Sequence, residues 1–277
     1  MATLRRSTGE RMWAVAVWTL VGFFIVNLLA LIGSVVVNSF GTRWFNTWLP
    51  AGYTPQWYAL AWNEFGLPDI LLVTVEVVGA VVLLSGLVGV PAAYAMARRD
   101  FPGKRAVMLL FLLPLLVPPI TYGIPLATVL YRAQLAGTIW GVILANLVPS
   151  LPFVILIMIP FVEQIDPRVE AAARVFGAGT GRLFVQVLVP LLTPGILAAL
   201  LLVLVRTIAM FELTFLTAGS TSQTLVVALY YAVFAAGVRP GQSIDAMAVV
   251  YMITTLVWLL IALRFVNPTQ IVTRAKR

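Results

Sequence analysis

Long apolar runs separated by short charged or turn-rich segments organise this 277-residue chain. A bilayer core about 30 Å thick is crossed by roughly 20 apolar residues in a helix. Runs of that length predict six membrane-spanning helices, at residues 13–37, 70–96, 106–130, 139–161, 190–216 and 246–265. A further run, Val226–Val238, is too short to span and is predicted to lie in a loop. The pattern predicts an all-α polytopic membrane protein, with a transmembrane domain at 13–265 between tails at 1–12 and 266–277.

Composition supports this class and excludes several others. Hydrophobic residues make up 61% and charged residues 10% of the chain, against about 45–50% and 25% in a soluble domain. Cys and His are absent, which removes thiol nucleophiles, disulfides, imidazole bases and the usual zinc ligands. We therefore expect no catalytic residues and no metal site. The basic residues that give the net charge of +8 lie between the apolar runs. We therefore expect the chain to contact membrane lipid and not nucleic acid.

The distribution of Lys and Arg predicts the orientation, because cytoplasmic loops are enriched in both. Six spans place both termini on one side, and fourteen of the 18 basic residues fall on that side: Arg5, Arg6, Arg11, Arg98, Arg99, Lys104, Arg105, Arg168, Arg174, Arg182, Arg264, Arg274, Lys276 and Arg277. The opposite side carries only Arg43, Arg132 and Arg239. Both termini are predicted to be cytoplasmic. The aromatic loop 38–69 would lie outside, as an interfacial belt or short surface helix, or as a docking surface for an external partner.

The predicted cytoplasmic loop 162–189 has the most specific pattern. Asp166 followed by Pro167 is typical of a helix start. Glu170 and Arg174 share one helical face, and Gly177 is a plausible helix stop. We expect a short helix, a sharp glycine turn and a second short segment. A solvated connector would explain the charges, but it would leave several apolar side chains exposed: Val175, Phe176, Leu183, Phe184 and Val187.

This loop resembles the permease subunits of bacterial ABC importers, whose signature is a Glu-Ala-Ala segment, a later glycine and a Leu-Pro-like step thirteen residues after it. Glu170-Ala171-Ala172, Gly177 and Pro190 fit that pattern. One feature departs, because the family's usual glutamate position falls on Ala171, while Glu170 matches an acid often found one residue earlier. The pattern leaves open which contact Glu170 makes. The resemblance extends from about Pro55 to the end and is nearest to the spermidine/putrescine type, although carbohydrate permeases share several features.

The resemblance implies a six-helix type I importer permease in the bacterial inner membrane, working with a second permease, identical or different. It also implies two ATPase subunits, which would bind ATP and Mg²⁺, and an extracytoplasmic solute-binding protein. Neither Lys104 nor Lys276 lies in a phosphate loop, so we expect no ATP site or other cofactor here. Residues 167–183 would couple to the ATPase, and the candidate coupling residues are Glu170, Ala171, Ala172, Arg174, Gly177, Arg182 and Pro190. The expected solute is polyamine-like or another cationic amine, with a carbohydrate as the alternative.

Charges and prolines inside the spans are candidates for the solute path. Arg206 and Glu212 lie about 120° apart around one predicted helix, which disfavours direct pairing. Glu212, next to Phe211, would face a cationic solute, or its carboxylate would bond to backbone or a neighbouring subunit. Pro118 and Pro119 free backbone carbonyls in the third span. Either they line the path or they only shape packing.

Two rival functions fit less well. An ion-coupled secondary transporter predicts inverted repeats with paired broken helices, but the sequence has no convincing internal repeat and that function leaves the cytoplasmic loop unexplained. An intramembrane enzyme without His or Cys would need a Ser/Lys or paired-Asp site. The acids near the spans are single, and no Ser-x-x-Lys occurs.

Overall fold

The computed structural model describes residues 8–45, 47–234 and 240–265. Its chain forms two compact units, unit 1 from Met1–Phe65 with Ala235–Val250 and unit 2 from Gly66–Phe234 with Tyr251–Arg277. The division falls inside the last helix, α12 (Gly241–Phe265). The predicted C-terminal tail, and residues 1–7 of the predicted N-terminal tail, lie outside the described residues.

Helices account for nearly all regular structure among the described residues, which confirms the predicted class. Five are long and apolar enough to cross a membrane: α1 (Thr8–Phe40), α3 (Leu67–Arg98), α6 (Ile139–Glu163), α9 (Val189–Ile208) with its preceding turns, and α12. A bent pair, α4 (Lys104–Leu116) and α5 (Pro119–Arg132), gives a sixth span if it counts as one. The six spans predicted from the sequence agree with the structure if α4 and α5 are counted as one span.

Three sequence expectations need correction. The third span is not continuous, because α4 and α5 meet at 103° where Pro118 and Pro119 lack amide donors. The fifth span ends at Ile208, and a separate helix, α10 (Glu212–Thr217), follows. The run at 226–238 is not a loop, since α11 (Leu225–Phe234) is helical and satisfies its backbone hydrogen bonds internally, as an apolar setting demands; residues 235–238 lie outside the described residues.

In unit 1, polar bonds connect the end of α1 to the following loop. The Ser39 and Tyr58 hydroxyls lie 2.8 Å apart, and the Trp57 indole donates to the Gly41 carbonyl at 2.7 Å. Tyr58 belongs to α2 (Gln56–Glu64), so the short helix expected in loop 38–69 is present. The Asn38 amide also donates to Asp245 at the start of α12. Docking of an external partner on this loop stays a prediction.

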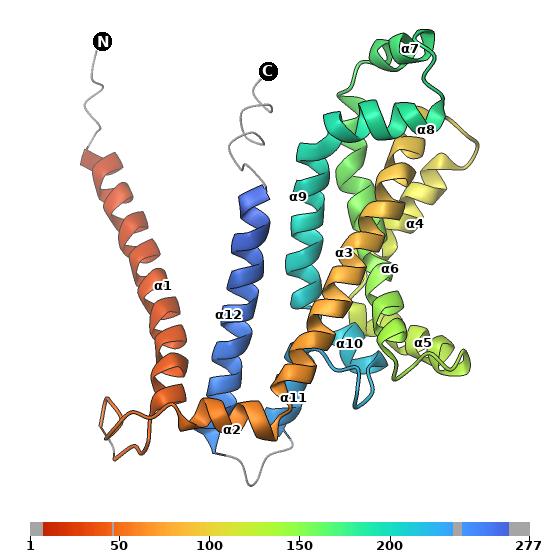
Figure 1. The fold of residues 1–277 in the computed structure, drawn as a ribbon. Coiled ribbons are helices and arrows are strands. Elements are labelled where there is room, and N and C mark those ends of the chain that lie inside the picture. The colour runs from red at the N-terminus through yellow and green to blue at the C-terminus, as the bar shows by residue number, and fades with distance from the viewer. Residues whose placement is uncertain (1–7, 46, 235–239, 266–277) are drawn as a thin grey trace. The chain divides into compact units, whose positions relative to one another are not determined.

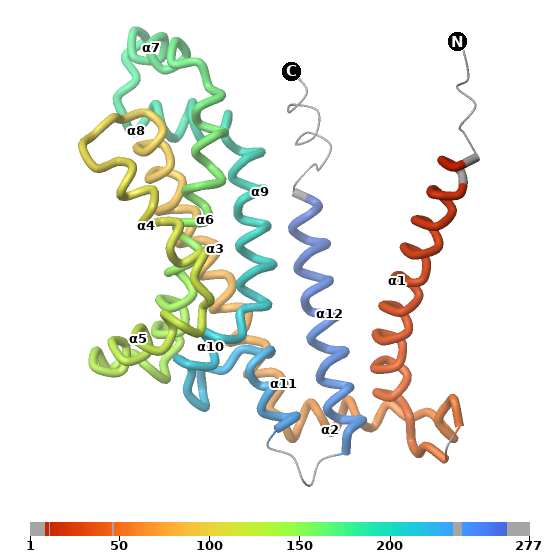
Figure 2. The backbone as a smooth tube through the Cα atoms, turned by 180° about the vertical axis from the view of Figure 1, so that it is seen from behind, coloured from red at the N-terminus to blue at the C-terminus, as the bar shows by residue number. Residues whose placement is uncertain are grey.

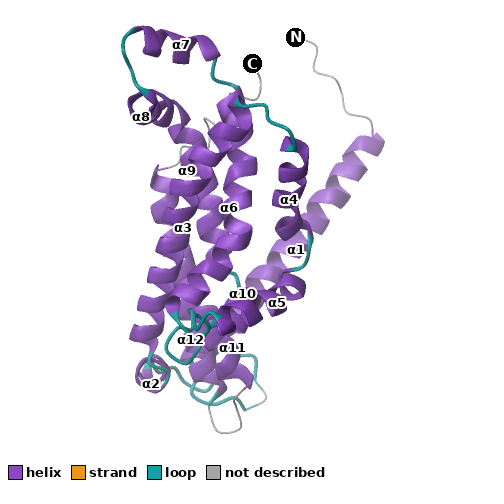
Figure 3. Ribbon diagram, turned by 90° about the vertical axis from the view of Figure 1, so that its right-hand side faces the viewer, coloured by secondary structure: helices purple, strands orange, loops and turns teal. Residues whose placement is uncertain are grey.

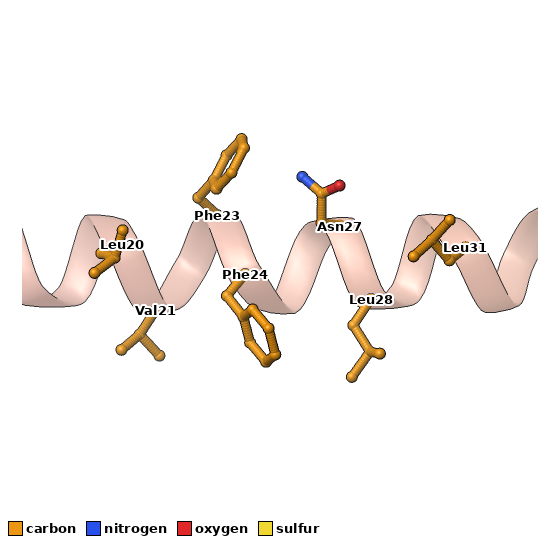
Figure 4. Close-up of a pocket in the computed structure, with 7 residues that line it drawn as sticks. All are labelled: Leu20, Val21, Phe23, Phe24, Asn27, Leu28 and Leu31. Carbon is orange, nitrogen blue, oxygen red and sulfur yellow. The ribbon is translucent and has the colours of Figure 1, made fainter.

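The apolar side chains of α1 are exposed around the helix. Figure 4 shows them pointing to both sides, with Phe23 and Asn27 opposite Val21, Phe24 and Leu28. Together with Leu20 and Leu31 they line a shallow surface groove of about 700 Å³. None of the apolar stretch of α1 is buried, which suits contact with lipid.

The core of unit 2 is formed by α3, α6 and α9, which pack against one another, with α4 beside α6 (Figure 1). Buried side chains at their interfaces include Val77, Val81, Val142, Val154, Met158, Ala199 and Val203. Gly89 on α3 lets the helices approach closely, since a Cβ there would lie 2.8 Å from the Val154 side chain. Figures 2 and 3 show α7 (Pro167–Val175) and α8 (Thr180–Leu183) at one end of this bundle, and α5, α10 and α11 at the other.

Candidate functional site

The loop between α6 and α9 forms the predicted helix, turn and second segment. The Asp166 carboxylate caps α7 by accepting from the Arg168 amide at 2.9 Å, and Pro167 occupies the first helical turn. Gly177 ends the helix with φ of +83°, a left-handed conformation that favours glycine. The second segment, α8, continues through a π-helical turn, η1 (Phe184–Leu188), into α9. The local signals in the sequence therefore predicted this architecture correctly.

Glu170 points into the protein. Its Oε1 accepts a hydrogen bond from Arg98 Nε on α3 at 2.7 Å, and its Oε2 accepts one from the Tyr94 hydroxyl at 2.6 Å. The expected partner one turn along, Arg174, is 4.0 Å away. The Glu170 side chain is only 7% exposed. The sequence left open which contact Glu170 makes; within this chain, its contacts are with Arg98 and Tyr94.

The other predicted coupling residues lie on the outer surface of the same segment. Ala171, Ala172 and Arg174 are exposed on α7, Arg182 is exposed on α8, and Pro190 is exposed in the first turn of α9. The structure thus brings these residues into one continuous segment with Gly177. Their role in coupling stays a prediction.

The apolar side chains of this loop divide into two groups. Leu183 is buried, and Phe184 and Val187 pack against the core of unit 2, so these three need no other partner. By contrast, Val175 is 85% and Phe176 91% exposed at the end of α7. An apolar pair this exposed beside a turn is unfavourable in water and suits a surface that is covered by another protein.

At the opposite end of unit 2, two broken helices meet. α10 packs against both α5 and α6. Gly123 on α5 allows this, because a Cβ there would lie 2.8 Å from the Leu216 side chain. The buried Asn146 amide on α6 donates to the Thr214 hydroxyl on α10 at 3.2 Å. Helix breaks at membrane depth are tolerated where they are buried in protein or line a water-filled cavity.

The predicted path residues lie at these two breaks. Pro118 and Pro119 begin α5, and Phe211 and Glu212 begin α10. Beside the first break, an apolar groove of about 470 Å³ is lined by Leu110, Phe111, Leu113, Pro114, Val117, Tyr122, Val148 and Pro152. The structure therefore places the four residues on neighbouring elements. Whether a solute contacts them stays a prediction.

Glu212 and Arg206 are not paired with each other in the described part of the chain. The sequence predicted that they would be unpaired because they lie on different faces of one helix. In the structure they are on two helices, since α9 ends at Ile208 and Glu212 begins α10. The Arg206 guanidinium lies 5.4 Å from the centre of the Phe153 ring, a cation–π contact. The Glu212 carboxylate has no hydrogen-bond or ion-pair partner among the described residues.

Two features were missed by sequence reasoning. Tyr94 and Arg98 are the partners of Glu170, and only the Arg98 charge at the end of the second span hinted at a role. The second feature is an aromatic cluster on α10 and α11 with its flanking residue: Phe211, Phe215, Tyr230, Tyr231 and Phe234. Phe211 stacks on Phe215 with ring centres 5.1 Å apart and lies 4.8 Å from the centre of Tyr230.

Comparison with solved structures identifies the fold. The chain is similar to a chain of a bacterial ABC transporter involved in the import of the acidic polysaccharide alginate, with a TM-score of 0.81 and 17% identity. The match covers 96% of this chain and 100% of that one. A second structure, of bacterial alginate ABC transporter in complex with an alginate pentasaccharide-bound periplasmic protein, matches with a TM-score of 0.65, 16% identity and 92% of each chain.

Sequence relatives carry several kinds of solute. The chain is 33% identical to a diacetylchitobiose uptake system permease of Streptomyces coelicolor over 54% of its length, and spans half of that relative. It is 35% identical to a trehalose transport system permease of Mycobacterium tuberculosis over 52% of its length and 48% of that protein. A molybdenum transport system permease of Escherichia coli K12 is 30% identical over 58% of this chain and 71% of its own.

The family match covers the regions that form the site. Residues 85–272 match the binding-protein-dependent transport system inner membrane component family, and this range includes the helix breaks, α7 and α8. Members are transport permeases of ABC importers and not enzymes, and with its apolar helices this places the chain in the inner membrane. The chain belongs to the family of inner membrane components of binding-protein-dependent transport systems.

Proposed function

We propose that this chain forms half of the membrane path of an ATP-driven importer, and that α7 and α8 are the surface through which an ATPase moves it. The observation that carries this proposal is the exposed pair Val175 and Phe176, at the end of a capped helix that is bonded to the membrane bundle. A short rigid helix transmits a displacement that a flexible loop would absorb. The apolar pair gives the ATPase a surface to bury.

The proposed partners are inferred from the family of this chain and from its lack of a phosphate loop for ATP. Its lysines are not in a phosphate loop, so two partner ATPases would bind ATP and Mg²⁺. A second permease, identical or different, would complete the path. An extracytoplasmic binding protein would deliver the solute, as the periplasmic protein in the alginate transporter structure suggests. In this arrangement both termini and α7 face the cytoplasm, in agreement with the bias in basic residues.

We propose a carbohydrate as the solute class. Relatives named for diacetylchitobiose and trehalose support it, and the aromatic cluster of α10 and α11 offers ring faces near a break. These relatives do not support the polyamine-like solute that the sequence suggested, although the carboxylate of Glu212 would suit a cation. Molybdenum permeases among the relatives make an oxyanion the second candidate.

Two measurements test this proposal. Affinity purification of the tagged chain, co-expressed with its neighbouring genes, should bring down an ATPase in a stoichiometric amount. The cognate binding protein should then be screened by thermal shift against trehalose, diacetylchitobiose, molybdate, sulfate and spermidine. Stabilisation by a sugar supports the assignment. Stabilisation by spermidine alone would restore the cationic solute, and a chain that purifies without any ATPase would contradict the importer function.

A further inference from the structure

α7 is bonded directly to α3, a helix that is distant from it in sequence. Arg98, at the last turn of α3, makes two contacts at once: its Nε donates to Glu170 Oε1 at 2.7 Å, and its Nη2 donates to the backbone carbonyl of Ile165. Arg98 therefore holds both α7 itself and the chain that leads into α7. A lysine would have to make both contacts from one nitrogen, whereas the guanidinium presents separate nitrogens in a fixed fork.

Tyr94 extends the contact to a third element. Its hydroxyl donates to Glu170 Oε2 at 2.6 Å, and its ring packs edge-on against Phe184 of η1, with ring centres 5.9 Å apart. The carboxylate thus accepts a charge-assisted bond on each oxygen. One side-chain cluster, Tyr94, Arg98, Glu170 and Phe184, joins α3, α7 and η1 in unit 2.

Burial makes this cluster unsuited to binding an external partner. The side chains of Arg98 and Glu170 are 17% and 7% exposed, so Glu170 has little surface to offer to an ATPase. Removing Arg98 would leave the poorly hydrated Glu170 carboxylate with only the longer contact to the exposed Arg174, at 4.0 Å, as an ion pair. Such a change is unfavourable. The exposed Ala171, Ala172, Val175 and Phe176 are on the surface that an ATPase could reach.

We propose that Glu170, Arg98 and Tyr94 are positioning residues that make α7 and the C-terminal end of α3 one rigid body. This inference rests on the proposed function: an ATPase that displaces α7 would then move α3 directly, in addition to α6 and α9, to which α7 is connected along the chain. The path-lining bundle would receive the displacement through three helices. Without the cluster, a displacement of α7 would reach only α6 and α9, through the chain, and α3 would not move with it.

The absence of cysteine makes a distance measurement straightforward. Spin labels on Arg168→Cys of α7 and Leu87→Cys of α3, both exposed positions, report the separation of the two helices in the assembled transporter in nanodiscs. Spectra are compared without nucleotide and after trapping with MgATP and vanadate. The parent should keep one narrow distance in both states. Arg98→Ala and the milder Glu170→Gln should show a nucleotide-dependent shift of about 2 Å or more, within the range of helix shifts in switching proteins.

Two further variants separate positioning from general destabilisation. Arg99→Ala removes a neighbouring but exposed arginine and should behave as the parent does. The exchanged pair Arg98→Glu with Glu170→Arg should restore part of the constant distance, as expected for coupled residues. A nucleotide-dependent distance in the parent would overturn the rigid body. So would an Arg98→Ala variant whose distance stays as constant as the parent's.

Different results would contradict the proposed function and the rigid-body inference. If no ATPase co-purifies, the importer assignment falls, whatever the distances show. If the ATPase binds and hydrolyses ATP normally while Arg98→Ala changes nothing, only the rigid-body inference falls.

Discussion

Gly195 on α9 lies against the ring of Phe161 on α6, where a Cβ atom would come within 2.6 Å of the ring carbon Cγ. Replacing Gly195 with valine should therefore force the two helices apart, at a cost of about 1–3 kcal/mol. Gly79→Val on α3 is the matched control, since a Cβ there meets nothing within 4 Å. The midpoint of thermal aggregation in detergent should fall for Gly195→Val and stay near the parent value for Gly79→Val. Equal midpoints for the two variants would contradict this packing.

The turn after α7 should depend on the backbone conformation of Gly177. Its φ of +83° is strained for any L-residue, at about 1–2 kcal/mol, whereas Gly179 has φ of −69°. A Cβ added at either glycine would meet no atom within 4 Å, so Gly177→Val and Gly179→Val differ chiefly in backbone strain. We expect Gly177→Val to lose solute uptake while the partner's ATPase activity persists, and Gly179→Val to retain uptake. Normal uptake by Gly177→Val would show that the turn is not required.

The exposed ring of Phe176 should contribute to binding the ATPase. Burial of a phenylalanine side chain is worth about 1.5–3 kcal/mol, so Phe176→Ser should weaken the complex by roughly tenfold or more. Phe176→Leu keeps an apolar side chain and should retain most of the binding. The amount of ATPase recovered with the tagged chain, across a dilution series, measures the difference. If serine and leucine variants recover ATPase equally, α7 does not bind through this ring.

Glu212 distinguishes between the solute classes. For a neutral carbohydrate, Glu212→Gln keeps an acceptor and should leave uptake within about tenfold of the parent, because a neutral hydrogen bond contributes only about 0.5–1.5 kcal/mol. A cationic solute would lose a counter-charge, and uptake should fall much further. Uptake in proteoliposomes of the compound that stabilises the binding protein is the measurement. A large loss with a sugar as solute would give the carboxylate a role that the carbohydrate assignment does not include.

Local signals allowed the sequence to predict the segment around α7. A capping aspartate, a proline at the helix start and a glycine at its end act within a few residues, so their pattern is readable directly. The bond between Arg98 and Glu170 joins residues 72 positions apart. No local pattern reports such a contact, since it depends on how α3 packs beside the loop.

The broken helices show a different limit. Pro118 and Pro119 predicted a disturbance of the third span, but missing amide donors do not determine the direction or size of a bend. Apolar composition continued across Ala209 and Met210, which hid the end of α9 within one hydrophobic run. Apolar composition also left the conformation of the run at α11 open: its length showed that it is too short to span, but not that it is helical.

ATP-dependent uptake by the reconstituted transporter tests the central claim most directly. The tagged chain, its second permease and its ATPase are placed in proteoliposomes with the liganded binding protein outside and ATP inside. We predict solute uptake that requires enclosed ATP and is lost in Gly177→Val, while ATP hydrolysis continues. Uptake by this chain alone, driven by an ion gradient and indifferent to ATP, would contradict the importer function.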